Sequence, residues 1–168
     1  MKKYKVGLIG CGRIGSLLED DPLRGKPCSH PGGFTALQSV RLVAGCDIDP
    51  ARLKHFGDRW GVKRLYSDHR EMLSREDLDI VCIATWTHLH TQMIVDAVHA
   101  GVRGIYCEKP IALNLESART VVKLCERKKI PLIINHERRW DFYYQKAREI
   151  IQKGSLGELR SIVCNALS

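Results

Sequence analysis

The sequence predicts an α/β fold, a doubly wound parallel sheet with helices on both faces. Short apolar runs alternate along the chain with segments of helical periodicity, which is typical of βαβ units. The apolar runs are continuous rather than alternating, and this indicates strands buried on both faces of a parallel sheet. A glycine-rich turn directly follows the first run. The 168-residue chain is 44% hydrophobic, which is enough for one compact domain with a sizeable core.

The strands and helices can be assigned in chain order. The expected strands are Tyr4–Ile9, Leu42–Cys46, a weaker one at Arg64–Tyr66, Ile80–Ala84, Gly104–Cys107 and Pro131–Ile134. Helices are expected after the Asp49-Pro50 cap, from Leu89 to Ala100 before Gly101, after the Asn114 cap, and from about Phe142 to Lys153 before Gly154. A last strand is expected to begin at Leu159 and run to Ala166.

One segment, Glu19–Gly33, interrupts the expected first helix. It is rich in proline and glycine and carries charges of both signs. It has two interpretations, a surface loop or a lid that contacts the substrate. Cys28 and His30 lie within it, but no second pair of metal-binding residues has suitable spacing, so no metal site is predicted.

The turn "GLIGCGRIG" contains G-x-G-x-x-G at Gly10, Gly12 and Gly15. The first glycine permits a tight turn, the second lets the backbone approach a pyrophosphate, and the third allows close packing. Arg13 and Ile14 belong to the same loop and are expected to contact the cofactor. The motif alone leaves two alternatives open, a turn without a ligand and the glycine turn of an S-adenosylmethionine-dependent methyltransferase.

Asp47 closes the second expected strand. A carboxylate at this place accepts hydrogen bonds from the ribose hydroxyls of the adenosine and repels a 2′-phosphate, which favours NAD over NADP. The basic side chains of Arg13 and Arg52 leave NADP as the less favoured alternative.

Two further segments end strands of the same sheet. "CIATWTHLHT" places Thr85, Trp86 and His90 after one strand, and "IYCEKPIALN" places Glu108 and Lys109 after the next. Because the carboxyl ends of parallel strands line the ligand crevice, all five are expected to face the cofactor.

Lys109 is the predicted catalytic residue. At the crevice end of a strand its amine can hydrogen-bond a substrate oxygen and take up the proton of that oxygen as hydride moves. Pro110 fixes the backbone that carries it and permits a cis Lys109–Pro110 bond. The alternative is a surface ion pair between Glu108 and Lys109.

Several of these motifs together resemble a known family. "GLIGCGRIG", "ATWTHLH", "GIYCEKPIAL", "HERRWD" and "IQKGSLGELRSI" are similar to segments of the Gfo/Idh/MocA oxidoreductases. The resemblance implies a Rossmann-type domain, NAD(P), and redox chemistry on sugars, cyclitols or related polyols, with Lys109 catalytic. Arg139 matches a family arginine near the nicotinamide. Where the family has threonine-proline, this chain has Thr85-Trp86.

The resemblance also implies a domain organisation. Residues 1–154 are expected to form the NAD(P)-binding domain, and residues 155–168 the first strand of a truncated α/β substrate domain. The expected whole enzyme is a homo-oligomer that acts on a small-molecule sugar or polyol, and this chain alone is expected to turn over poorly or not at all. A non-catalytic NAD(P)-sensing domain is the alternative.

Composition limits the other partners and the location. The net charge is +8, but the basic residues are scattered, so nucleic acid is not an expected partner. No apolar run approaches the length of a membrane span. Seven cysteines without a C-x-x-C pair indicate a reducing cytoplasm.

Overall fold

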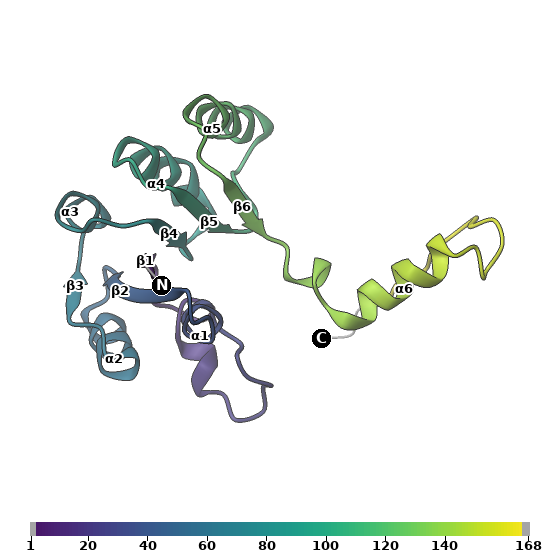
Figure 1. Cartoon of the computed structure of the whole chain (residues 1–168), viewed down its shortest axis with the longest axis horizontal. Helices are drawn as coiled ribbons and strands as arrows, with labels where there is room; N and C mark the ends of the chain where they lie inside the picture. The colour runs from purple at the N-terminus through teal and green to yellow at the C-terminus, as the bar shows by residue number, and fades with distance from the viewer. Residues whose placement is uncertain (1–2, 166–168) are drawn as a thin grey trace. The chain divides into compact units, whose positions relative to one another are not determined.

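The computed structural model describes residues 3–165, and its centre is a six-stranded parallel sheet (Figure 1). The strand order is β3-β2-β1-β4-β5-β6. The strands are β1 (Tyr4–Ile9), β2 (Val40–Cys46), β3 (Arg64–Tyr66), β4 (Ile80–Ile83), β5 (Gly104–Glu108) and β6 (Leu132–Asn135). All six predicted strands are confirmed, with ends that differ by at most two residues.

The strand order fixes where a ligand can bind. The chain lays down β2 and β3 on one side of β1, then crosses over and places β4, β5 and β6 on the other side. This reversal creates a crevice at the carboxyl ends of β1 and β4. Backbone hydrogen bonds continue the pairing to that edge, since the Gly10 N–H donates to Cys46 O and the Ala84 N–H donates to Ile9 O, each at 2.8 Å.

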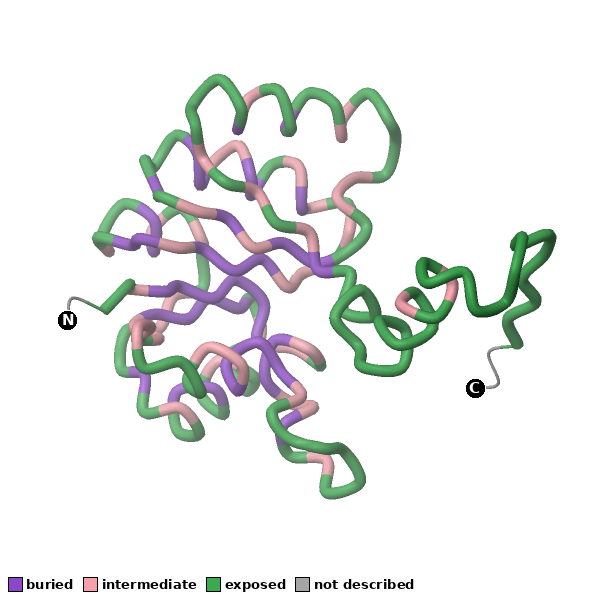
Figure 2. The backbone as a smooth tube through the Cα atoms, turned by 45° about the vertical axis from the view of Figure 1, so that its right-hand side comes forward, coloured by how far each residue is buried: buried purple, intermediate pink, exposed green. Residues whose placement is uncertain are grey.

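Helices cover both faces of the sheet, as the doubly wound prediction requires (Figure 1). One apolar cluster joins the strands to α3 (His69–Arg75), α4 (Thr87–His99) and α5 (Leu115–Lys128). The other joins them to α1 (His30–Thr35) and α2 (Pro50–Trp60), with Phe56 fully buried. The central strands are accordingly the most buried part of the backbone (Figure 2).

The first helix is interrupted, as the composition of Glu19–Gly33 predicted. After the glycine loop the chain makes a turn and the short 3₁₀ helix η1 (Leu17–Asp20), then a loop, and only then α1. Ser29 caps α1 by accepting a hydrogen bond from the Gly32 N–H, and Pro31 occupies the first turn.

The chain divides into two compact units, Met1–Asn135 and His136–Ser168. The second contains η2 (Glu137–Arg139) and α6 (Phe142–Gln152), which Asp141 caps. The helix predicted at Phe142–Lys153 is therefore confirmed to within one residue.

The strand expected from Leu159 to Ala166 is not formed across residues 159–165, and Ala166 lies outside the described residues. The described part of this unit has no other strand to accept its backbone hydrogen bonds, and an isolated strand leaves those groups unpaired. The assignment of residues 155–168 to a second domain stays a prediction.

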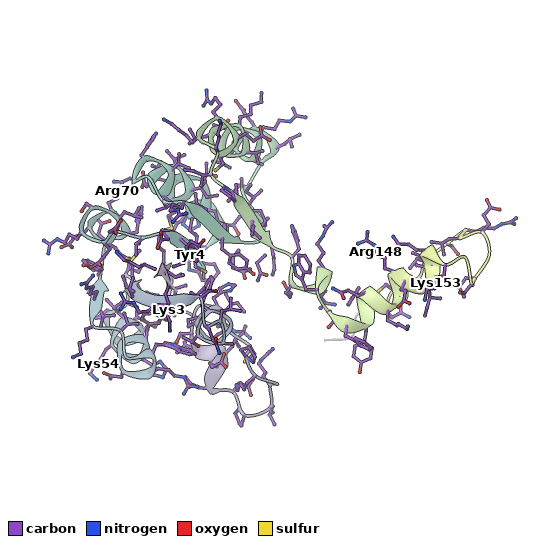
Figure 3. All side chains as sticks on the ribbon, in the orientation of Figure 1. Lys3, Tyr4, Lys54, Arg70, Arg148 and Lys153 are labelled. Carbon is purple, nitrogen blue, oxygen red and sulfur yellow. The ribbon has the colours of Figure 1, made fainter. Side chains whose placement is uncertain are left out.

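Three of the basic residues labelled in Figure 3, Lys54, Arg70 and Lys153, have carboxylate partners on the same or a neighbouring helix. Lys54 pairs with Asp58 along α2, Arg70 of α3 pairs with Asp96 of α4, and Lys153 pairs with Glu149 at the end of α6. These pairs neutralise part of the positive charge locally.

Among the helices of the described chain, none is both long enough and apolar enough to cross a membrane.

The packing of α2 on the sheet yields a first prediction. A Cβ atom added at Gly45 would lie 2.2 Å from the ring of Phe56, which has no space to move. We expect Gly45→Ala to lower the free energy of unfolding by about 1–3 kcal/mol, as overpacked cores do. The measurement is urea unfolding.

Gly25→Ala is the matched control, because a Cβ there meets no atom within 4 Å. The Gly45→Ala/Phe56→Leu double variant should recover part of the loss. Equal stability of the two single variants would contradict this account of the α2 packing.

Candidate active site

The glycine loop lies at the carboxyl end of β1, and the fold itself requires glycine at two of its three glycine positions. Gly10 has φ +95°, and a Cβ there would lie 2.5 Å from the carbonyl oxygen of Ala84. A Cβ on Gly15 would lie 1.9 Å from the Gly10 carbonyl oxygen, so the loop could not close. A Cβ on Gly12 would come no nearer than 3.7 Å, to the Arg52 guanidinium. The backbone at Gly12 is thus open to an approaching anionic group.

Asp47 holds the glycine loop to the end of β2. Its side chain is buried, and it accepts hydrogen bonds from the Cys11 N–H at 2.7 Å and the Asp49 N–H at 2.9 Å, one on each oxygen. Each carboxylate oxygen has a second lone pair that can still accept a ribose hydroxyl. Asp47 therefore fits a cofactor contact and also shapes the loop.

Two arginines flank this end of the crevice and are exposed. Arg13 is in the glycine loop itself. Arg52 lies in the first turn of α2, 3.4 Å from the carboxylate of Asp49, with its guanidinium beside Gly12. Ile14 is half-buried, and its carbonyl oxygen accepts a hydrogen bond from the His30 N–H at 3.0 Å.

The segment after β4 contains a buried histidine, His90, and an exposed tryptophan, Trp86. The two ring nitrogens of His90 lie 2.7 Å from the Pro110 carbonyl oxygen and 3.1 Å from that of Thr85, and the side chain is fully buried. His90 thus acts on the crevice through the backbones of Thr85 and Pro110. Thr85 is half-buried next to Gly10, whereas Trp86 is 76% exposed.

Glu108 and Lys109, which follow one another at the end of β5, point to different surroundings. Glu108 is 8% exposed, and Lys109 is exposed. No described carboxylate forms an ion pair with the Lys109 ammonium, so the surface ion-pair interpretation does not hold. The Lys109–Pro110 bond is cis. At this edge of the sheet a buried carboxylate, Glu108, is thus followed by the exposed side chain of Lys109.

The Glu108 carboxylate is fully engaged by the protein. Oε1 lies 2.9 Å from His30 Nε2 and 2.6 Å from Asn135 Nδ2, and Oε2 accepts a hydrogen bond from the Lys109 N–H at 3.2 Å. Burial alone would raise the pKa of Glu108, but the hydrogen bonds from His30 and Asn135 outweigh it and hold that pKa below its ordinary value of 4.5. Glu108 is therefore an ionised anchor.

His30 and Asn135 are the members of this site that sequence reasoning missed. The sequence pattern offers His30 only as a metal ligand, and His30 lies 78 positions from Glu108. Asn135 was placed just beyond the last strand. Nothing in the local sequence pattern marks either residue, because their partner is brought to them only by the strand order.

The predicted residue Arg139 lies in the second unit. It is part of η2 and is exposed there, and its N–H donates to the His136 carbonyl oxygen at 2.9 Å. The other predicted residues belong to the first unit, at the carboxyl ends of β1, β2, β4 and β5.

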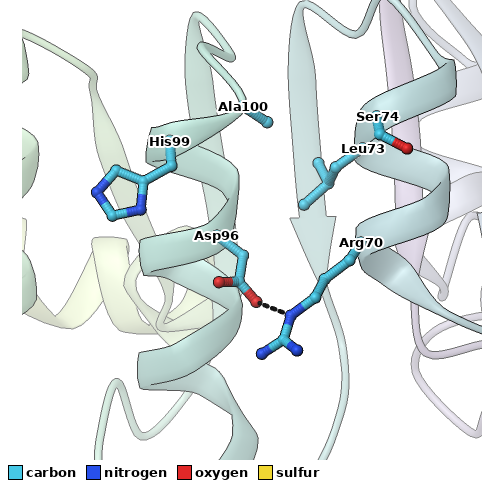
Figure 4. A pocket seen from close by; sticks show the side chains of 6 residues that line it. All are labelled: Arg70, Leu73, Ser74, Asp96, His99 and Ala100. Atoms are coloured by element: carbon cyan, nitrogen blue, oxygen red, sulfur yellow. Dashed lines mark hydrogen bonds and ion pairs between the residues drawn. The ribbon is translucent and has the colours of Figure 1, made fainter.

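A hollow of about 400 Å³ lies elsewhere, between α3 and α4 (Figure 4). Arg70 and Asp96 meet across it at 3.0 Å. It is lined by Arg70, Leu73, Ser74, Asp96, His99 and Ala100, none of which is a predicted cofactor residue. It is therefore separate from the edge of the sheet where the glycine loop lies.

A parallel sheet with this strand order, a tight glycine loop and a carboxylate at the end of β2 defines a dinucleotide-binding Rossmann domain. Residues 4–136 match the family model described as the oxidoreductase family with an NAD-binding Rossmann fold. The chain belongs to this family, the Gfo/Idh/MocA oxidoreductases. NAD as the cofactor and the predicted fold class are confirmed.

Individual relatives cover nearly all of the chain. A D-apiose dehydrogenase from Paraburkholderia graminis is 36% identical over 94% of the chain, which spans 38% of that protein. A myo-inositol 2-dehydrogenase from Thermotoga maritima is 25% identical, with 92% and 42% covered. The chain thus spans about two fifths of the length of these curated relatives.

A solved structure shows the same fold. The scyllo-inositol dehydrogenase from Lactobacillus casei, crystallised with NAD(H) and scyllo-inositol, superposes with a TM-score of 0.81 at 26% identity. The match covers 94% of this chain and 43% of that one.

The lowered pKa of Glu108 predicts how stability depends on pH. Because the folded-state pKa is below 4.5, the ionised carboxylate stabilises the fold above that pH, and this stabilisation is lost as the pH falls through the folded-state pKa. We expect the free energy of unfolding of wild type to decrease more steeply than that of Glu108→Gln between about pH 5 and pH 3.

Urea unfolding at several pH values measures this difference. Glu126→Gln, at an exposed carboxylate of α5, is the control and should follow wild type. Parallel curves for wild type and Glu108→Gln would show that Glu108 gains no stability from its ionisation.

Proposed function

We propose that this chain is the NAD-binding domain of a dehydrogenase that oxidises a hydroxyl-bearing carbon of a sugar, cyclitol or related polyol. The observation that carries the proposal is the exposed amine of Lys109, which follows the buried anchor Glu108 at the carboxyl end of β5. The names of the relatives, apiose and inositol dehydrogenases, support the substrate class.

The chain's own residues perform binding and proton transfer. When bound, NAD⁺ supplies the hydride acceptor. The N–H groups of the glycine loop would hold the pyrophosphate near Gly12, and Asp47 would accept hydrogen bonds from the adenosine ribose. In its unprotonated form, Lys109 would take the proton of the substrate hydroxyl as the hydride leaves the same carbon, so that a carbonyl forms and the lysine becomes an ammonium.

The remaining predicted residues have supporting roles. Arg13 and Arg52 would attract the phosphates by their charge, and Ile14 would contact the cofactor from the same loop. Thr85 and Trp86 form the wall of the crevice after β4, and His90 fixes that wall from inside. Arg139 is proposed to contact the nicotinamide end, as the family resemblance implies.

The alternatives have different standing. Family membership removes the support for a methyltransferase. A non-catalytic NAD sensor would also bind NAD, so only a measurement of substrate turnover distinguishes it from a dehydrogenase.

We also propose a homo-oligomeric whole enzyme in the cytoplasm without nucleic-acid or membrane partners. The seven free cysteines, of which only Cys164 is exposed, support a reducing compartment.

The catalytic role of Lys109 can be tested in the catalytically active protein. We expect Lys109→Met to lower kcat for oxidation of inositol or D-apiose by about 10²–10⁴-fold, the range for loss of a general acid–base group. NAD affinity should change little, since the lysine faces the substrate.

Lys63→Met, at an exposed lysine before the amino end of β3, is the charge-matched control and should retain wild-type turnover. Near-normal kcat in Lys109→Met would refute the proposed role. NADH binding without turnover of any polyol by wild type would favour the sensor.

The preference for NAD over NADP is the second test. Asp47→Ala should weaken NADH binding about ten- to a hundredfold, because charge-assisted hydrogen bonds to the ribose are lost, and should narrow the gap to NADPH. Fluorescence titration of the chain with both cofactors measures this.

Asp49→Ala is the control, because Asp49 caps α2 and should not decide the preference. A wild-type chain that binds NADPH about ten times more tightly than NADH would overturn the assignment of Asp47.

A further inference from the structure

We propose that His30, which the insertion Glu19–Gly33 delivers to the start of α1, is a positioning residue for the catalytic lysine and acts through Glu108. This inference rests on the proposed function of Lys109. The insertion then is neither only a surface loop nor a lid over the substrate. Its ends are part of the site, whereas residues 22–27 in its middle are exposed.

His30 connects the two functional segments of the crevice. Its backbone N–H donates to the Ile14 carbonyl oxygen of the glycine loop at 3.0 Å. Its ring nitrogen Nε2 lies 2.9 Å from Glu108 Oε1, next to the lysine. A single residue thus fixes the cofactor loop through its main chain and the end of β5 through its side chain.

The His30 ring has a fixed place. It is 8% exposed and packs edge-on against the Tyr106 ring, with the ring centroids 5.3 Å apart. The Tyr106 hydroxyl in turn donates to Asn135 Oδ1 at 2.7 Å, and Asn135 donates to the same Glu108 oxygen that His30 contacts. Two buried donors therefore converge on Oε1, which leaves Oε2 directed at the Lys109 N–H.

The rest of the insertion holds His30 in this position. Glu19 Oε2 accepts hydrogen bonds from the Ser29 hydroxyl at 2.6 Å and from the Cys28 N–H at 3.1 Å. A Cβ on Gly32 would lie 2.4 Å from the same Glu19 oxygen, so α1 packs directly on this carboxylate. Residues 22–27 between these contacts are exposed. The tip lies at the surface, whereas buried contacts hold the return of the chain at His30.

Removing the His30 side chain would have a local effect. Glu108 would remain buried with one donor fewer, and a buried charge that loses a partner reorients or recruits water. The Glu108 hydrogen bond to the Lys109 N–H would weaken, and the lysine would lose its fixed backbone. The contact of the His30 N–H with Ile14 would survive, because it belongs to the main chain.

The first test uses this chain without any substrate. Amide hydrogen exchange is measured in wild type, His30→Ala and His30→Gln, the last of which keeps an N–H donor at the end of the side chain. We expect exchange at Lys109 to be about tenfold faster in His30→Ala and near wild type in His30→Gln, with Val81–Ile83 of the core unchanged. His69→Ala is the matched control, because His69 Nε2 lies 2.8 Å from Asp96 in a comparable pair between α3 and α4.

The second test uses turnover in the catalytically active protein. We expect His30→Ala to lower kcat about ten- to a hundredfold with little change in NADH affinity, and His30→Gln to recover most of it. If His30 acts through Lys109, the His30→Ala/Lys109→Met double variant should be no slower than Lys109→Met alone. A purely structural role would instead lower stability and NADH affinity together and add to the lysine effect.

The outcomes separate this inference from the proposed function. A whole wild-type enzyme that turns over no sugar or polyol, or an active Lys109→Met variant of it, would refute the proposed function. A slow Lys109→Met variant beside a fully active His30→Ala variant, or unchanged exchange at Lys109, would overturn only the role of His30. Should His30→Ala fail to fold, Asn135→Ala removes the other donor to Oε1 and must give the same exchange and kcat changes for the proposal to stand.

Discussion

Two buried carboxylates at the carboxyl edge of the sheet, Asp47 and Glu108, impose the constraint on which the site depends. A buried charge is tolerated only where protein donors satisfy it. Asp47 is satisfied by the Cys11 and Asp49 N–H groups, and Glu108 by His30, Asn135 and the Lys109 N–H. Each carboxylate thereby fixes the loop that supplies its donors, so the edge of the sheet is ordered by electrostatics as well as by packing.

In this arrangement the buried side chains and the exposed side chains have different roles. The buried residues His90, Glu108 and Asp47 hold backbone segments, and the exposed side chains of Lys109, Trp86 and Arg13 are free to meet ligands. Catalysis requires the reacting group to be held in a defined geometry, and a fixed backbone limits the positions that the Lys109 amine can take. It explains why Glu108 and Lys109 adjoin each other in sequence although their side chains have opposite surroundings.

Family membership and the site geometry support different parts of the functional conclusion. The match over residues 4–136 establishes the fold and the cofactor class. The substrate class rests on relatives of which the chain spans about two fifths. The insertion contributes a link between the glycine loop and the end of β5, because its last residues place His30 in contact with both.

The sequence by itself determined the strands, the glycine loop and the position of Asp47 and Lys109 at strand ends, because apolar periodicity and glycine spacing are local signals. The strand pattern that begins at Leu159 is not realised in residues 159–165, because it meets no partner strand in the described unit. Only the tertiary structure decided that Glu108 points inward, that His90 is a clamp, and that His30 and Asn135 meet on one oxygen atom. Their separations along the chain are tens of residues, and the pairing of β5 with β6 brings Asn135 to Glu108 whereas the insertion brings His30 there.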